Sequence, residues 1–299
     1  MAVSFKNDSR KPATFRCRSH PKFDQMESLL NKAKNWESTI SSSNPSADII
    51  CSGFSHLKVL LECLEDLFNT NLSDRTTSPV LKTHPMKWAD ELLDVSVMFL
   101  DICYNASDIM SVTRQHVIGL GCDVKRNVGC SSDQSIVSKY IEFRNKMKKD
   151  VKRSMGRLIK DTDNMIRGCS LMVDSENYHL IRVFKEVASF SILIFEFLLE
   201  FLAIKPSKRT RTRGWTAVSR FLSNGKVVPA DTTSGNELQL LDAALLRYSS
   251  TDKHDFLQVV LKNIEALEDT VEGINSHINS MSRSMIATRA SILNMISFY

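Results

Sequence analysis

Apolar side chains recur at alternating steps of three and four residues along the last part of the chain, residues 257–299. A heptad pattern sustained over six repeats predicts one long helix with a narrow apolar seam. At ~1.5 Å per residue, this helix would be about 65 Å long. The seam must pack against helices of the same chain or against a second copy. The series comprises Leu257, Val260, Ile264, Leu267, Val271, Ile274, Ile278, Met281, Met285, Thr288, Ile292, Met295 and Tyr299.

Shorter helical patterns precede this segment, and no stretch of useful length alternates as a strand does. Gly (10) and Pro (7) are both scarce, which favours helices over a turn-rich β fold. We predict an all-α fold, an elongated helical bundle with a long C-terminal heptad-repeat (coiled-coil-like) helix. The expected earlier helices cover residues 21–40, 57–68, 85–109, 133–167, 175–204, 215–222 and 237–248.

The domain organisation follows from charge and loop composition. Residues 1–22 hold six cations against Asp8, which equals the net charge of +5 for the whole chain, so the remaining residues are balanced. We expect a disordered basic tail over residues 1–20 and a single helical domain over residues 21–299. The Ser-rich run 38–46 is expected to be a linker. Flexible loops are expected near residues 41–47, 119–132, 205–214 and 224–236.

Two charged stripes follow helical spacing on consecutive predicted helices. One interpretation of the basic stripe is a patch for nucleic acid or anionic lipid. The favoured interpretation is that it faces the acidic stripe or water. Few aromatic side chains accompany it, so no nucleic-acid binding is expected. The acidic stripe comprises Asp90, Asp94, Asp101, Asn105 and Asp108, and the basic stripe comprises Lys146, Lys149, Arg153, Arg157 and Lys160.

Residues 187–204 are apolar enough to suggest a membrane span. The polar residues of the helix, among them Glu196 and Glu200, fall within one sector of about 100° on a helical wheel. Each carboxylate would cost about 2.5 kcal/mol or more at the depth of a bilayer. A central bundle helix with one solvated stripe is therefore favoured over a membrane-embedded hairpin.

The seven cysteines are scattered without a CxxC pair, which favours a reducing compartment. The N-terminus lacks the apolar segment of a secretory signal, although its basic composition resembles that of transit peptides. We expect a cytoplasmic location, with plastid and endomembrane-associated locations as alternatives.

The chain offers no pattern for catalysis. The glycines at 119 and 121 lack the third glycine of a dinucleotide fingerprint, and Cys122 and Cys130 have no histidine between them. No HExxH, GxSxG or Walker motif is present. We predict that the protein is not an enzyme and has no catalytic, cofactor or metal site. The best candidates for contact with an anionic lipid or partner are in one loop, Lys205, Lys208, Arg209, Arg211 and Arg213.

An ordered set of short phrases resembles the land-plant BYPASS-like family, catalogued as domain of unknown function 241. The phrases are FRCRSHP at 15–21, KNWE at 34–37, CSG at 51–53, LLECLEDL at 60–67, KWADELLD at 87–94, LDIC at 100–103, RNKMKK at 144–149, VKR at 151–153, GWTAVS at 214–219 and TRASILN at 288–294. The resemblance implies a plant-restricted helical protein without an established enzymatic activity, connected with root and shoot development. It assigns no chemical role to any residue.

We therefore predict a non-enzymatic protein-interaction or scaffold factor in root and shoot development. The expected partners are unidentified proteins, with a homodimer through the C-terminal heptads as one option. The alternative is a peripheral membrane protein that binds anionic lipid through the 205–213 loop and the basic stripe of residues 146–160.

Overall fold

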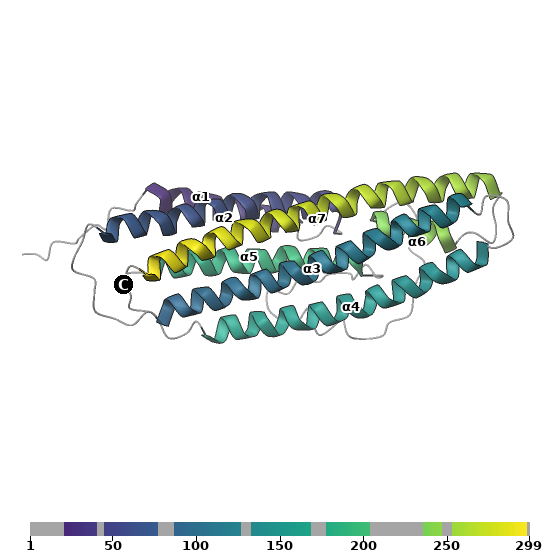
Figure 1. Cartoon of the computed structure of the whole chain (residues 1–299). Helices are drawn as coiled ribbons and strands as arrows, with labels where there is room; N and C mark the ends of the chain where they lie inside the picture. Colours follow the sequence, from purple (N-terminus) through teal and green to yellow (C-terminus); the bar gives the residue numbers. More distant parts are fainter. Residues whose placement is uncertain are drawn as a thin grey trace, which may run out of the picture.

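The computed structural model describes residues 21–40, 45–76, 87–126, 133–168, 178–203, 236–246 and 253–297. Nearly all of these residues belong to helices, which run side by side in an elongated bundle (Figure 1). The predicted all-α bundle with a long C-terminal helix is confirmed. The helices are α1 (Pro21–Ile40), α2 (Ala47–Thr76), α3 (Lys87–Arg126), α4 (Asp133–Gly168), α5 (Tyr178–Leu202), α6 (Glu237–Leu246) and α7 (Lys253–Ser297).

Helix α7 packs along α2 and α3 (Figure 1). Every position of the heptad series from Val260 to Met295 is buried. The one polar member, Thr288, donates its hydroxyl hydrogen to the Ser284 carbonyl at 3.1 Å, so its burial leaves no polar group unsatisfied. The chain's own helices therefore cover the seam, and a dimer formed through it would require the bundle to open.

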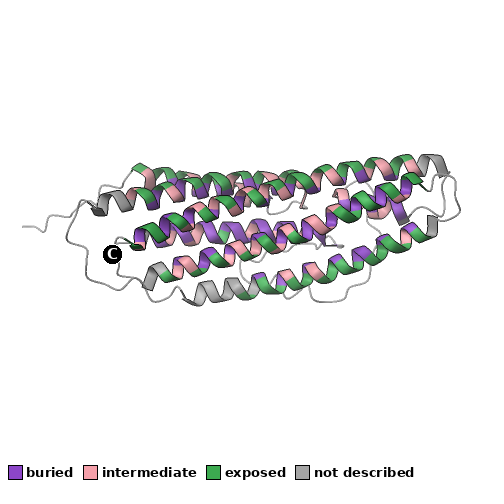
Figure 2. Cartoon of the chain, viewed as in Figure 1, coloured by how far each residue is buried: buried purple, intermediate pink, exposed green. Residues whose placement is uncertain are grey.

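Helix α5 runs through the middle of the bundle and is the most continuously buried helix in Figure 2. The Phe195 ring meets Phe54 and Phe99 edge-on, with ring centroids 5.6 and 6.1 Å away. The interpretation of this segment as a core helix is confirmed. The N-terminal part of its polar stripe is ion-paired with neighbouring helices. Glu186 pairs with Lys34 of α1 at 2.7 Å, and Lys185 pairs with Glu91 of α3 at 3.8 Å.

By length and composition alone, one helix in the described part of the chain could cross a membrane, the stretch Asp90–Arg126 of α3. Core helices of water-soluble proteins have the same properties. In this bundle α3 has its most extensive contact with α7 and also packs on α4 and α5. These contacts account for its apolar side chains.

Several helix ends differ from those predicted. Helix α1 continues to Ile40, into the expected Ser-rich linker, and α2 continues to Thr76 although an end before Asn69 was expected. No Gly or Pro interrupts residues 69–76, so a polar composition alone does not end the helix. Helix α3 continues to Arg126, so the loop predicted from Gly119 was wrong over residues 119–126. The predicted 215–222 helix lies outside the described residues.

Close packing explains the glycine at 121 inside α3. A Cβ atom added at Gly121 would lie 3.3 Å from Cγ2 of Ile264 on α7. A glycine inside a helix costs roughly 0.5–1 kcal/mol relative to Ala. The close approach of α3 to α7 at this point offsets that cost.

A second glycine is needed where α1 meets α2. The Trp36 indole packs edge-on against Phe190 and Phe197 of α5, with ring centroids 5.5 and 6.1 Å away. A Cβ added at Gly53 would lie 2.8 Å from the Trp36 Cη2 atom and 3.1 Å from Cγ1 of Ile194. Only glycine leaves room for the indole between the three helices. This contact joins Trp36 of the phrase at residues 34–37 to Gly53 of the phrase at residues 51–53.

Candidate functional site

The predicted contact loop, with Lys205, Lys208, Arg209, Arg211 and Arg213, lies outside the described residues. The structure does show where the chain enters it. The Arg144 guanidinium on α4 donates through Nη1 to the Leu202 carbonyl at the end of α5, at 3.3 Å. The end of α5 at Leu202 therefore lies beside α4, the helix that carries the second basic feature of the sequence.

That second feature is a basic face on α4. Helix α4 lies at one edge of the bundle, where it packs chiefly against α3 and α5 (Figure 1). Figure 2 shows that most of the outer surface of its described part is exposed. Five exposed lysines make no ion pair within the described residues, and we refer to them as the basic face. They are Lys146, Lys148, Lys149, Lys152 and Lys160.

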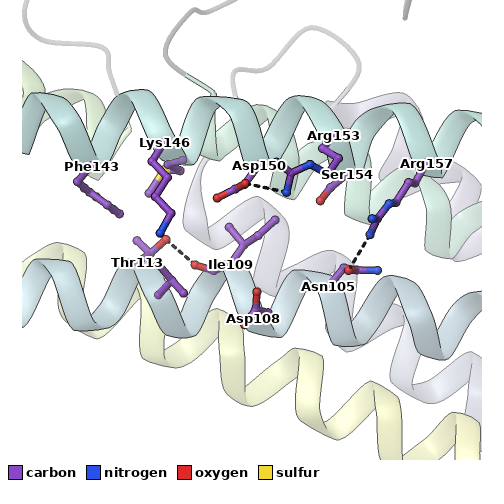
Figure 3. Close-up of a pocket in the computed structure, with 12 residues that line it drawn as sticks. Asn105, Asp108, Ile109, Thr113, Phe143, Lys146, Asp150, Arg153, Ser154 and Arg157 are labelled. Carbon is purple, nitrogen blue, oxygen red and sulfur yellow. Dashed lines mark hydrogen bonds and ion pairs between the residues drawn. The ribbon is translucent and has the colours of Figure 1, made fainter.

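A shallow open groove runs between α3 and α4 beside this face, with a volume of about 270 Å³ (Figure 3). Its polar lining includes Lys146, Arg153 and Arg157 on α4, and Asp108 on α3. Asp150 also lines the groove and pairs with Arg153 on its own helix at 3.1 Å. The lining therefore carries three cations against two carboxylates, so its net charge favours an anion.

Hydrogen bonds across the groove show how the two charged stripes meet. Arg157 donates through Nη1 to the Asn105 side-chain oxygen at 3.3 Å (Figure 3). Nearer the other end of the two helices, Lys139 pairs with Asp123 at 3.3 Å. The expectation that the stripes face each other thus holds near Asn105 and Asp108. No ion pair joins the two stripes within the described residues.

His116 marks the apolar end of the groove region. Its ring stacks on Phe143 of α4, with ring centroids 4.2 Å apart. Burial against this ring, together with the positive charge of Lys146, lowers the pKa of His116 below its usual value. A neutral imidazole at neutral pH adds no positive charge to the groove.

The most buried charge of the described residues is Arg144, whose side chain is only 5 % exposed. Its Nε and Nη2 atoms donate to the two carboxylate oxygens of Asp242 on α6, at 2.9 and 2.6 Å. The Tyr140 hydroxyl donates to the same carboxylate at 2.7 Å. This bidentate pair joins α4 to α6, and the bond from Arg144 Nη1 to the Leu202 carbonyl adds the end of α5. Burial, and next the Asp242 charge, raise the pKa of Tyr140, so this hydroxyl remains a donor.

Asn236 anchors the start of α6. Its side-chain oxygen accepts from the Gln239 amide at 2.9 Å, and the Gln239 side chain accepts from the Asn236 amide at 3.2 Å. This reciprocal arrangement is a capping box. The Asn236 side-chain amide also donates to the Phe201 carbonyl at 2.9 Å, which ties α6 to the end of α5.

Sequence reasoning missed the Arg144–Asp242 pair. A signal was present, because Arg144 follows Tyr140 by four residues and precedes Met147 by three on the apolar stripe of α4. A cation on a buried stripe requires a partner. Its partner is 98 residues away in the sequence, at a position that no local pattern distinguishes.

The described residues provide little reactive chemistry. They contain no group of three or more His, Cys, Asp or Glu side chains that could hold a metal ion. The Cys103 thiol is buried, and burial raises its pKa to about 12, which suppresses the thiolate. The basic edge of α4 and the adjoining groove are the features of the described surface with a distinct charge.

Comparison with known proteins identifies the family. The family model described as Protein BPS1 matches residues 53–295, and the chain belongs to this family. The resemblance to BYPASS-like proteins seen in the sequence is thereby confirmed. Membership indicates a plant developmental protein, and no catalytic activity is known for the family. No curated protein and no solved structure matches the chain.

Proposed function

We propose that the protein is a non-enzymatic interaction factor in root and shoot development that holds protein partners on its helical surfaces in the cytoplasm. The observation that carries this proposal is the basic face of α4. Its five lysines extend over about 20 Å of helix at ~1.5 Å per residue and make no ion pair within the described residues. An acidic partner would neutralise them and gain speed of association from the field of the face.

The same face favours a second candidate function, binding to an anionic membrane. Each lysine near such a surface contributes about 1 kcal/mol. Together, three or four such lysines suffice for measurable peripheral binding. The cations of residues 205–213 follow directly after the end of α5, which Arg144 holds beside α4, and they would add to this attraction.

One set of variants tests both candidates. Lys148→Glu, Lys149→Glu and Lys152→Glu together reverse the basic face. A matched control, Lys32→Glu, Lys125→Glu and Lys262→Glu, makes the same change in net charge at exposed lysines on α1, α3 and α7. Co-sedimentation with phosphatidylcholine vesicles, with and without phosphatidylserine, measures membrane binding. Affinity purification from plant tissue with quantitative mass spectrometry measures partner binding.

The outcomes separate the candidates. If the protein is an interaction factor, the wild type and the control variant should enrich the same partner proteins. The variant with the reversed basic face should fail to enrich them, and none of the three should bind vesicles. Salt-sensitive binding to phosphatidylserine vesicles that is lost with the reversed face would favour the membrane function. The Lys208→Glu and Arg211→Glu pair would show whether the 205–213 segment contributes. Identical behaviour of the reversed face and the control in both assays would contradict both candidates.

A further inference from the structure

A second exposed surface lies over the outer side of the seam between α3 and α7. Large apolar side chains project from both helices, with Val97 42 % and Tyr104 74 % exposed on α3, and Ile286 56 % and Leu293 43 % exposed on α7. Each pair is separated by seven residues, or two helical turns, so both members lie on one side of their helix. We call these four side chains the apolar strip.

Hydrogen bonds between the two helices place the two pairs of side chains on adjacent helices. Arg289 donates through Nη1 to the Leu93 carbonyl at 2.9 Å and to the Ser96 hydroxyl at 2.8 Å. Ile286 and Leu293 lie about one turn to either side of Arg289, and Val97 directly follows Ser96. Helices α2 and α5 cover the inner side of the α3–α7 pair, so the exposed side chains of both helices face outward together.

A row of carboxylates borders the strip on α3. Asp94, Asp101 and Asp108 are exposed and follow each other at intervals of seven residues. None of these three forms an ion pair within the described part of the chain. On α7, the exposed residue one turn before Ile286 is Arg283, a cation. The carboxylates therefore border the strip on its α3 side only. The surface is therefore apolar along its centre and acidic along the α3 flank.

These features indicate which kind of partner would bind the apolar strip. The backbone groups of α3 and α7 are engaged within their helices, which excludes addition of a β-strand. Exposed apolar side chains at two-turn intervals on two adjacent antiparallel helices match the spacing of the apolar face of a third helix. We propose that the apolar strip docks an amphipathic helix of a partner protein, with Lys or Arg along the flank that faces Asp94 and Asp101. This rests on the proposed interaction function and names the chemistry of one partner.

The charges distinguish this occupant from others. An anionic membrane would be repelled by the carboxylate row, whereas it would be attracted to the basic face of α4. A partner helix with acidic flanks would place like charges together, which costs affinity. The two surfaces therefore select partners of opposite charge.

A pair of synthetic peptides provides the test. The first is an 18-residue fluorescein-labelled helix with Leu at i, i+3, i+4 and i+7 spacing and Lys on one flank, and the second carries Glu in place of each Lys. Fluorescence anisotropy with the full-length protein should show at least tenfold tighter binding of the Lys peptide. Tyr104→Ser with Ile286→Ser should weaken its binding at least tenfold. Asp94→Lys with Asp101→Lys should reverse the preference between the two peptides.

The controls keep the result interpretable. Val59→Ser with Val259→Ser changes two other exposed apolar residues, away from the strip, and should leave binding unchanged. Circular dichroism should show the same melting temperature for all variants, because every substituted side chain is exposed. Equal binding of both peptides, or equal binding by the wild type and the strip variant, would overturn the proposal. So would light scattering that shows a wild-type dimer dissociated by the strip variant, because the occupant would then be a second copy. None of these outcomes affects the test on Lys148, Lys149 and Lys152, so the proposed function stands or falls separately.

Discussion

The pair between Arg144 and Asp242 leads to the most specific prediction about stability. Asp242→Ala would remove the acceptor of three hydrogen bonds, two from Arg144 at 2.6 and 2.9 Å and one from Tyr140 at 2.7 Å. Removing one partner of a buried ion pair costs about 3–5 kcal/mol because the other charge remains buried. The Asp242 side chain is 21 % exposed, so water can reach the site in part. We therefore expect the lower end, about 3 kcal/mol.

The loss of stability should appear first in α6, because the Arg144–Asp242 pair and the Asn236 contacts attach this short helix to α4 and α5. Hydrogen exchange of the α6 amides should accelerate by about a hundredfold in Asp242→Ala, while the amides in the middle of α7 remain protected. A double variant, Arg144→Met with Asp242→Leu, removes both charges and should be more stable than Asp242→Ala alone. This reasoning would be refuted if the α6 amides of Asp242→Ala exchanged within twofold of the wild-type rate and the double variant were no more stable than Asp242→Ala.

Four further outcomes follow from the packing and the shifted groups. Gly53→Ala should cost about 1–3 kcal/mol in urea unfolding because its Cβ would meet the rigid Trp36 ring, whereas Gly156→Ala, with open space around it, should be neutral or slightly stabilising. Ile274→Ala in the buried seam should cost about 2–5 kcal/mol, while Ile286→Ala should change stability by less than about 0.5 kcal/mol. The folded protein should react with a thiol reagent at exposed Cys122 and not at Cys103, whose pKa is raised to about 12, and equal labelling of the two in mass spectrometry would contradict the structure. The pKa of His116 is lower in the folded state than in the unfolded chain, where it is about 6.5. Protonation of His116 therefore favours unfolding as the pH falls through about 6.5. His116→Phe should weaken this acid-side loss of stability in urea titrations at several pH values, and an unchanged pH profile would argue against the stacked, neutral ring.

Local periodicity determines much of this fold, which is why the helices could be predicted. The heptad series of α7 and the apolar face of α5 each need a continuous partner surface, and a long bundle is the arrangement that provides it. The starts of α1 at Pro21 and of α4 at Asp133 were found because proline and aspartate are favourable there. The continuation of α3 past Gly119 was missed, because the contact of Gly121 with Ile264 that favours it is tertiary.

The surfaces were harder to predict than the core. The two charged stripes are visible in the sequence. Where they face each other across the groove depends on the register of the antiparallel helices α3 and α4, which the hydrogen bond between Arg157 and Asn105 shows. The apolar strip combines residues almost 200 positions apart, and its two halves appear in the sequence only as isolated apolar residues on polar faces. Three lysines of the basic face, Lys146, Lys149 and Lys160, belong to the predicted basic stripe because they follow helical spacing, whereas Lys148 and Lys152 lie outside that spacing.

The bundle requires the heptad helix α7 to be buried against α3 of its own chain. Engineered cysteines at Gly121 and Ile264, in a Cys122→Ser background, test this contact, because a Cβ at position 121 would lie 3.3 Å from the Ile264 side chain. The structure predicts that mild oxidation joins them within one chain, so that the protein migrates as a compact monomer on a non-reducing gel and peptide mapping recovers the 121–264 link. A ladder of disulfide-linked dimers, or free thiols at both positions after oxidation, would contradict it.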